Sequence, residues 1–277
     1  MPEGDTIFKA ARTLDRALAG KRVTRFESVF PHLTRVHEDQ PVTGRTVEHV
    51  RSSGKHMLMQ FSGDLILRTH MRMNGSWHIY RPGENWQRPR HAMRIIVGTE
   101  DFVAVGFDIP VAEMLSTRDL PRHRELRRLG PDLLDESFDA SEAARRIRES
   151  GGSQIADVLL NQRVLAGIGN VYKSEVLFAC GVNPFATVDQ LTDAEIELLV
   201  ATARKFLRAN VTGGLAAMTT YTGFRSTTGR SSPNERLWVY GRAGEPCRRC
   251  GSAIEIRPQG PDARLTYWCS TCQPSKS

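Results

Sequence analysis

The chain has 277 residues, a length at which we expect two or more domains with hydrophobic cores of their own. Its formal net charge of +7 favours polyanionic partners such as nucleic acid, although solubility alone also explains so modest an excess. No stretch approaches the ~20 consecutive apolar residues of a membrane span, and the acidic start lacks the features of a signal peptide, so we expect a cytoplasmic protein with no membrane partner.

The first four residues, Met1 to Gly4, have the composition of a covalent catalyst. Removal of Met1, which the small side chain of Pro2 permits, would leave a secondary amine at the terminus. Attack of this amine on a sugar C1′ gives an iminium ion that carries its charge without a proton, so that elimination becomes easy. Glu3 would move protons nearby. Taken alone, the same residues are also typical of a frayed terminus.

The N-terminal half predicts one helix followed by short strands. Apolar residues at helical spacing predict a helix over residues 5–19, which stops at Gly20. From residue 23 to about residue 112 the period shifts towards two, and turn residues divide the pattern into strands. We expect these strands over residues 45–51, 56–61, 65–69, 76–80, 93–97 and 102–107. Short strands at this spacing are typical of a β-sandwich.

Two polar features stand out among these strands. Lys55 lies beside the Gly54 turn at the start of a strand, where a lysine is usually a solvated edge charge. Farther along, Met71 and Met73 flank Arg72 at the tip of a turn. An apolar tip beside a cation is what a wedge between DNA bases needs, and the alternative is that the methionines fold back into the core.

The second half begins with a basic, proline-broken linker and continues as helices. Residues 155–160 and 170–179 predict helices on either side of a turn over 163–169, and Thr192 with Glu195 forms a capping box at the start of a longer helix. Two glycines leading into a helix capped by Asn170, with Lys173 following, indicate either a DNA backbone contact or a purely structural helix hairpin. Residues 211–235 predict a mobile loop that closes over a substrate.

Four of the five cysteines form two C-x2-C pairs separated by eighteen residues: Cys247, Cys250, Cys269 and Cys272. This spacing predicts a closed tetrahedral zinc site, one per chain and structural, and two disulfides are the alternative in an oxidising compartment. The remaining cysteine, Cys180, is expected to be a buried structural thiol.

Four separated motifs together resemble the bifunctional DNA glycosylases that include formamidopyrimidine-DNA glycosylase and endonuclease VIII. They are Pro2–Glu3–Gly4, Ser53–Gly54–Lys55, LAGIGNVYKSE from Leu165 to Glu175, and the four cysteines. The resemblance implies an α+β multidomain fold with DNA in its cleft. An N-terminal helix and β-sandwich over residues 1–115 would be followed by a basic linker over 116–135, a helical helix-two-turn-helix domain with the mobile loop over 136–235, and a zinc ribbon over 236–277.

The resemblance also implies the roles of catalytic residues. Pro2 would be the imine-forming nucleophile, and Glu3 the acid-base partner that helps to open the sugar ring. Lys55 would be the general acid and a phosphate contact during elimination. Arg264, five residues before Cys269, would grip the phosphate of the damaged nucleotide.

Further residues would bind double-stranded damaged DNA. The resemblance implies that Asn170 shares the phosphate with Arg264, and that Arg128 contacts DNA from the linker. Arg72, Met73 and Asn74 would fill the void left by the extruded nucleotide.

Within the family, Pro2–Glu3–Gly4–Asp5 and Gly244–Glu245–Pro246–Cys247 look more like endonuclease VIII than like the purine-directed branch. The arginine of the Arg-x-Phe wedge of that branch is missing from residues 105–110. We therefore expect a monomeric, nucleoid-associated base-excision glycosylase with AP lyase activity by β,δ-elimination, acting on oxidised pyrimidines. The alternatives are an oxidised-purine glycosylase, a non-catalytic zinc-ribbon protein that binds damaged DNA, and a basic RNA-associated protein. The Arg72–Met73–Asn74 sequence departs from the Gln-Leu-Tyr pattern of endonuclease VIII.

Overall fold

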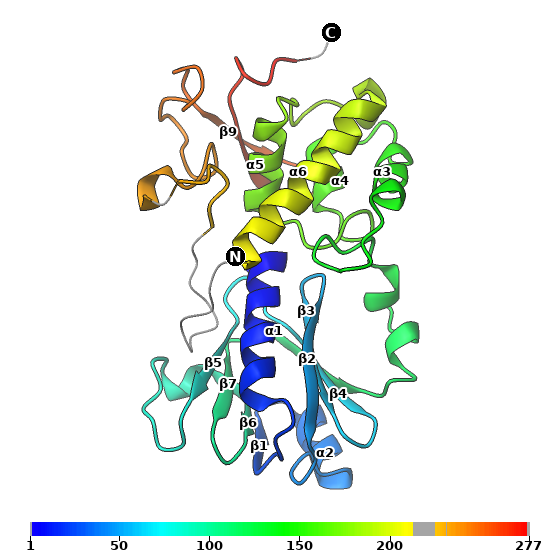
Figure 1. Ribbon diagram of the computed structural model, residues 1–277, viewed down its shortest axis with the longest axis vertical. Coiled ribbons are helices and arrows are strands. Elements are labelled where there is room, and N and C mark those ends of the chain that lie inside the picture. Colours follow the sequence, from blue (N-terminus) through cyan, green and yellow to red (C-terminus); the bar gives the residue numbers. More distant parts are fainter. Residues whose placement is uncertain (1, 213–224, 231, 276–277) are drawn as a thin grey trace. The chain divides into compact units, whose positions relative to one another are not determined.

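The computed structural model describes residues 2–212, 225–230 and 232–275 of the chain (Figure 1). The described residues form two compact units, the first over residues 2–127 and the second from residue 128 onward. Most of the loop expected over residues 211–235 lies outside the described residues. The division into the four expected parts stays a prediction. None of the described helices has both the length and the apolar character that a membrane crossing requires.

The first unit contains a long helix, a short helix and two four-stranded antiparallel sheets (Figure 1). The helices are α1 (Gly4–Leu18) and α2 (Pro31–Asp39). One sheet has the order β1 (Arg25–Ser28), β6 (Met93–Gly98), β7 (Val103–Phe107), β5 (Ser76–Tyr80). The other has the order β2 (Val47–Ser53), β3 (His56–Phe61), β4 (Leu65–His70), β8 (Val111–Leu115).

Both sheets and α1 share one hydrophobic core. Leu14 of α1, Met59 of β3 and Ile95 of β6 are buried in the same apolar cluster. Side chains of this kind each contribute roughly 1.5–3 kcal/mol when they leave water completely. In addition, the Asp15 carboxylate accepts the Val50 N–H at 2.7 Å and so joins α1 to β2. The expected helix and β-sandwich are therefore confirmed.

The six expected strands are all present, with ends that differ by at most two residues. Three further elements, α2, β1 and β8, were not expected. Helix α2 has nine residues and buries only Leu33, so few apolar positions mark it in the sequence. Strand β8 buries one residue of five, Ala112, and its pairing with β4 is a long-range contact that no local pattern encodes.

The second unit begins with four α-helices: α3 (Ala140–Arg148), α4 (Ile155–Leu160), α5 (Asn170–Ala179) and α6 (Asp193–Val211). The expected bounds of α4 and α5 are confirmed. So is the capping box, in which the Glu195 carboxylate accepts the Thr192 N–H at 2.8 Å and the Thr192 hydroxyl accepts the Glu195 N–H at 3.3 Å. Short 3₁₀ turns complete the described helices: Arg90–Ala92, Leu120–Arg122, Leu126–Arg128, Val188–Gln190 and Pro233–Glu235.

The last part of the second unit is an antiparallel hairpin of β9 (Glu255–Gln259) and β10 (Arg264–Trp268). Phe178 of α5 packs in one small core with Ile254 and Cys269. The hairpin is thus held against the helices, which completes the expected α+β architecture.

Candidate functional site

In the first unit, Pro2 and Glu3 immediately precede helix α1 and are buried. Glu3 is the N-cap residue, with an extended backbone, and its carbonyl accepts the first helical hydrogen bond from Ile7 at 3.0 Å. The N-terminal end of a helix carries a partial positive charge, which favours anionic groups there. A buried segment continuous with a helix does not fit a frayed terminus. The catalytic roles of Pro2 and Glu3 stay predictions.

Lys55 lies in the tight turn that joins β2 to β3. Gly54 has a φ of 57°, in the left-handed region that favours glycine, and Ser53 pairs with His56 across the turn. Strand β3 in turn pairs His56 with His70 at the end of β4. Burial is the main cause that lowers the pKa of His70, and the nearby positive charge of Lys55 adds a smaller contribution. The structure therefore brings Lys55 near the end of β4, where the next candidate residues begin.

Residues 71–75, called here the 71–75 turn, connect β4 to β5. Met71 is 3% exposed and belongs to the hydrophobic core, whereas Met73 is 54% exposed, with Arg72 and Asn74 exposed on either side. The Gly75 N–H donates to the Met71 carbonyl at 2.9 Å and closes the turn. The sequence left open whether the two methionines are buried in the core or exposed at the tip of the turn. Met71 is buried in the core, and Met73 is exposed to solvent.

In the second unit, Arg128 is exposed and precedes a segment that is fixed to the turn between α4 and α5. The Gly130 N–H donates to the Gln162 carbonyl at 2.9 Å, and the Ala166 N–H donates to the Pro131 carbonyl at 3.0 Å. A Cβ at Gly130 would lie 2.4 Å from the Val164 carbonyl oxygen, so this close approach requires glycine. The position of Arg128 at the start of the unit follows from these contacts.

The structure brings Asn170 and the start of β10 together. The Asn170 side chain, 8% exposed, donates from Nδ2 to the Leu265 carbonyl at 2.7 Å, directly after Arg264. Its Oδ1 has no hydrogen-bond partner among the described residues. The expectation that Asn170 caps α5 is wrong, because Gly169 is the N-cap and Asn170 is the first helical residue.

Lys173 does not contribute to the DNA backbone contact considered for this turn, because it is buried. Lys173 is 1% exposed, and its ammonium donates to Thr266 Oγ1 at 2.8 Å and to the Leu265 carbonyl at 3.3 Å. A buried lysine needs such partners, since an isolated charge is costly away from water. Lys173 therefore fixes β10 against α5 and supports the position of Arg264.

Sequence reasoning missed the role of Glu175, the last residue of the LAGIGNVYKSE motif. This carboxylate is fully buried and accepts the peptide N–H groups of Trp238, Val239 and Tyr240 at 2.8–2.9 Å, as well as the Thr227 hydroxyl. Burial raises the pKa of Glu175, and these donors oppose the rise. Its partners lie more than fifty residues away, so no local signal reveals it.

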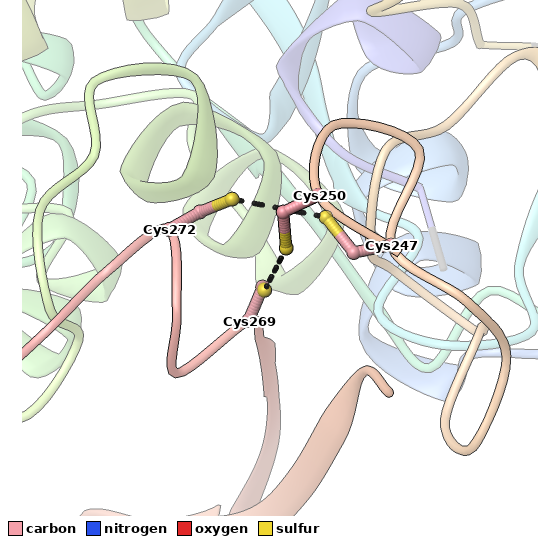
Figure 2. A group of neighbouring side chains, drawn as sticks. All are labelled: Cys247, Cys250, Cys269 and Cys272. Carbon is pink, nitrogen blue, oxygen red and sulfur yellow. Dashed lines mark hydrogen bonds between the residues drawn. The ribbon is translucent and has the colours of Figure 1, made fainter. Parts of the chain in front are cut away.

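Figure 2 shows the four cysteines of the two pairs, which converge from separate turns. All four sulfur atoms lie within 4.8 Å of one another, with Cys247 Sγ to Cys272 Sγ at 3.9 Å and Cys250 Sγ to Cys269 Sγ at 3.4 Å. These are free thiols, not disulfides. Four thiolates at ~2.3 Å from a tetrahedral zinc ion would be roughly 3.8 Å apart, so the cluster fits a metal ion.

Cys180 is not part of this cluster. It is half-buried rather than buried, and its thiol donates to Thr202 Oγ1 at 3.4 Å. The pKa of the Cys180 thiol is raised by burial.

Comparison with known proteins identifies the family. Residues 1–108 match the N-terminal domain of formamidopyrimidine-DNA glycosylase, and residues 129–222 match its helix-two-turn-helix domain. A probable endonuclease 8 2 of Streptomyces coelicolor is 42% identical over 276 residues, covering 99% of this chain and 94% of the relative. The chain belongs to the formamidopyrimidine-DNA glycosylase and endonuclease VIII family.

Two more members of the family match over their full length. The DNA-(apurinic or apyrimidinic site) lyase Nei2 of Mycolicibacterium smegmatis is 38% identical, with 99% of each chain covered, and endonuclease 8 of Escherichia coli is 32% identical, with 99% of this chain and 100% of the relative covered. A structure of Lactococcus lactis Fpg in complex with abasic-site DNA superimposes with a TM-score of 0.82 at 24% identity, covering 99% and 100% of the two chains, and shows the same fold. The protein is a base-excision DNA glycosylase and AP lyase.

Proposed function

We propose that this glycosylase removes oxidised pyrimidines and cuts the strand by β,δ-elimination. The observation that carries the proposal is the full-length similarity to proteins named endonuclease 8, at 32–42% identity. The absence of an arginine from residues 105–110, where the purine-directed branch has its wedge, supports the same lesion class.

In the proposed mechanism, the Pro2 nitrogen attacks C1′ of the damaged nucleotide and the bond from C1′ to the base breaks. Glu3 protonates the ring oxygen, the sugar opens, and the Pro2 nitrogen keeps the positive charge as an iminium ion. Loss of a proton from C2′ sends electrons into the iminium and expels the 3′ phosphate. A second elimination expels the 5′ phosphate, with Lys55 as the acid that serves the leaving groups, and water then releases Pro2.

Double-stranded damaged DNA is the proposed substrate, bound by a monomer in the nucleoid. Arg128, Asn170 and Arg264 would contact phosphates, and the net charge of +7 supports a polyanionic partner. Arg72 and Asn74 would flank Met73 as it fills the gap left by the extruded nucleotide. The exposure of Met73 beside the buried Met71 supports this role.

A structural zinc ion is the proposed occupant of the four-cysteine cluster. A closed site with four thiolates leaves no coordination position for substrate, so the ion would supply folding energy and no chemistry. Cys269 directly follows β10, the strand that begins at Arg264. The metal would therefore support the position of this arginine.

Borohydride trapping on a panel of oligonucleotides tests the proposal. Reduction during reaction with oxidised-pyrimidine or abasic DNA should give a covalent adduct at Pro2, and Pro2→Gly should slow trapping by orders of magnitude. A form that retains Met1 is the matched control, because its Pro2 nitrogen is an amide. An adduct at Lys55 would refute the mechanism, and faster excision of oxidised purines than of oxidised pyrimidines would refute the lesion class.

A further inference from the structure

A buried arginine connects four segments of the first unit. The side chain of Arg68, on β4, is 2% exposed, and its guanidinium pairs with Glu113 of β8 and with Glu125 of the linker. It also donates to Nδ1 of His56, the residue that follows Lys55, at 2.9 Å. His123, likewise in the linker, lies 2.8 Å from the Glu113 carboxylate.

Stability alone is a poor explanation for this arrangement. Burying a guanidinium carries a large desolvation cost, and apolar replacements of buried ion pairs are often neutral or stabilising. Arg68 lies opposite Leu58 in the sheet, and its Nε has no partner among the described residues. A methionine at this position would fill similar space without the cost.

The contacts of Arg68 lead to the 71–75 turn. The His56 ring, held by the guanidinium, packs edge-on against His70 with centroids 4.8 Å apart. His70 Nδ1 accepts the backbone N–H of Arg72 at 3.0 Å. Arg72 has a φ of 50°, a left-handed conformation that is unfavourable for a residue other than glycine. The His70 hydrogen bond offsets this strain directly before Met73.

We propose that Arg68 is a positioning residue, which acts through His56 and His70 to hold the Arg72 backbone in the conformation that presents Met73. The proposal rests on the proposed function, because it takes Met73 to be the group that enters DNA. It goes further by naming a residue that touches neither DNA nor the reacting atoms.

This chain of contacts from Arg68 to the Arg72 backbone requires a neutral His70, since a protonated ring cannot accept the Arg72 N–H. Burial, together with the charges of Arg72, Arg68 and Lys55 and against that of Glu125, lowers the pKa of His70 to about 4.

The pKa of the neighbouring His56 ring is lowered in the same way, to about 2. Burial is the largest cause and the charge of Arg68 the second, with smaller contributions from His70, His123 and Arg72. Both rings are therefore neutral at physiological pH. Without the guanidinium, the carboxylate of Glu125 would act on His70 with less opposition, and the pKa of His70 would rise.

Arg68→Met tests the proposal. Histidine resonances of the free protein should show the pKa of His70 moving from about 4 towards the ordinary ~6.5. On duplex DNA with a fluorescent base opposite a tetrahydrofuran abasic analogue, the variant's insertion signal should fall between about pH 8 and about pH 5.5. The fall should stay below about tenfold, because burial and the charge of Arg72 still keep the pKa of His70 below its ordinary ~6.5. The wild-type signal should stay level over this range.

Three control variants separate positioning from general damage. Arg68→Lys keeps the positive charge and should restore the level profile. Glu125→Gln removes the opposing charge and should also stay level. Thr69→Val changes the next residue of β4, which faces the other side of the sheet and accepts the Trp77 indole N–H at 3.3 Å, so it should lower stability without creating a pH dependence.

A level profile for Arg68→Met, or an unchanged His70 pKa, would overturn the proposal while leaving the glycosylase mechanism intact. If the wild-type protein gives no insertion signal at all, the proposed role of Met73 fails and this proposal fails with it. Arg68→Gln is a second neutral variant and replaces Arg68→Met if that protein does not fold.

Discussion

Substitution of Gly75 by alanine tests whether the shape of the 71–75 turn matters for lesion recognition. A Cβ at this position would lie 2.6 Å from the Met71 carbonyl oxygen and 2.8 Å from the Met71 Cα. The oxygen is the acceptor that closes the turn, and the new Cβ and this oxygen would have to move apart by roughly 0.8 Å to reach the 3.4 Å of ordinary contact. Met71 is fixed in the core. The exposed side of the turn must therefore move, and Met73 with it.

Overpacking of this kind costs about 1–3 kcal/mol. If the cost falls on the conformation that presents Met73, insertion into duplex DNA should weaken by about 5- to 140-fold, since each ~1.4 kcal/mol is a factor of ten. Fluorescence of a base opposite an abasic analogue measures this step. Encounter with undamaged DNA, measured by salt-dependent binding, should change little, because no cationic side chain is removed.

Gly83→Ala is the matched control. Gly83 has a φ of 81°, and a Cβ there meets nothing within 4 Å, so alanine adds backbone strain of about 1 kcal/mol or more without touching the 71–75 turn. Equal effects of the two substitutions on insertion would refute the reasoning. So would a Gly75→Ala protein that inserts and excises like the wild type.

Three further predictions concern the second unit. Cys250→Ser should lose bound zinc and DNA cutting together, as checked by metal analysis beside a cleavage assay, and full activity after the metal is stripped would contradict it. Arg128→Ala and Arg264→Ala should each weaken binding to damaged and undamaged DNA alike and reduce the slope of log affinity against log salt by roughly one; an unchanged slope in a salt titration would contradict a phosphate contact. Glu175→Gln should lower the free energy of unfolding by about 2–4 kcal/mol in thermal or urea denaturation, because, whichever oxygen is replaced, the new amide N–H₂ faces at least one peptide N–H donor.

The elements that the sequence predicted well are those whose signals are local. Helices α4 and α5 were expected at their observed bounds because glycines, a proline and a buried apolar run mark both ends. The six expected strands likewise have turn residues between them. Helix α2 and strands β1 and β8 carry too few buried residues for such a signal, and they form through contacts with distant strands.

The site could be predicted only as far as residue type and spacing extend. The four cysteines converge as their spacing indicates. Spacing could not separate the buried Met71 from the exposed Met73, because both flank the same arginine. It could not show that Lys173 is buried against Thr266, since that contact joins residues ninety-three positions apart. Whether a charged side chain is buried depends on its hydrogen-bond partners, and a single sequence does not show which residues these are.

The strand register of one sheet explains why Lys55 and the 71–75 turn lie close together. Pairing of β3 with β4 sets His56 opposite His70, so the turn that carries Lys55 and the turn that carries Met73 start at the same end of two adjacent strands. A shift of one residue in this pairing would place His56 on the opposite face of the sheet from Arg68 and His70, which share one face of β4. The sheet therefore fixes the place of the lysine and of the projecting methionine. The exposed residues of the turn, Arg72 to Asn74, are the part of this region that can vary without altering the strands.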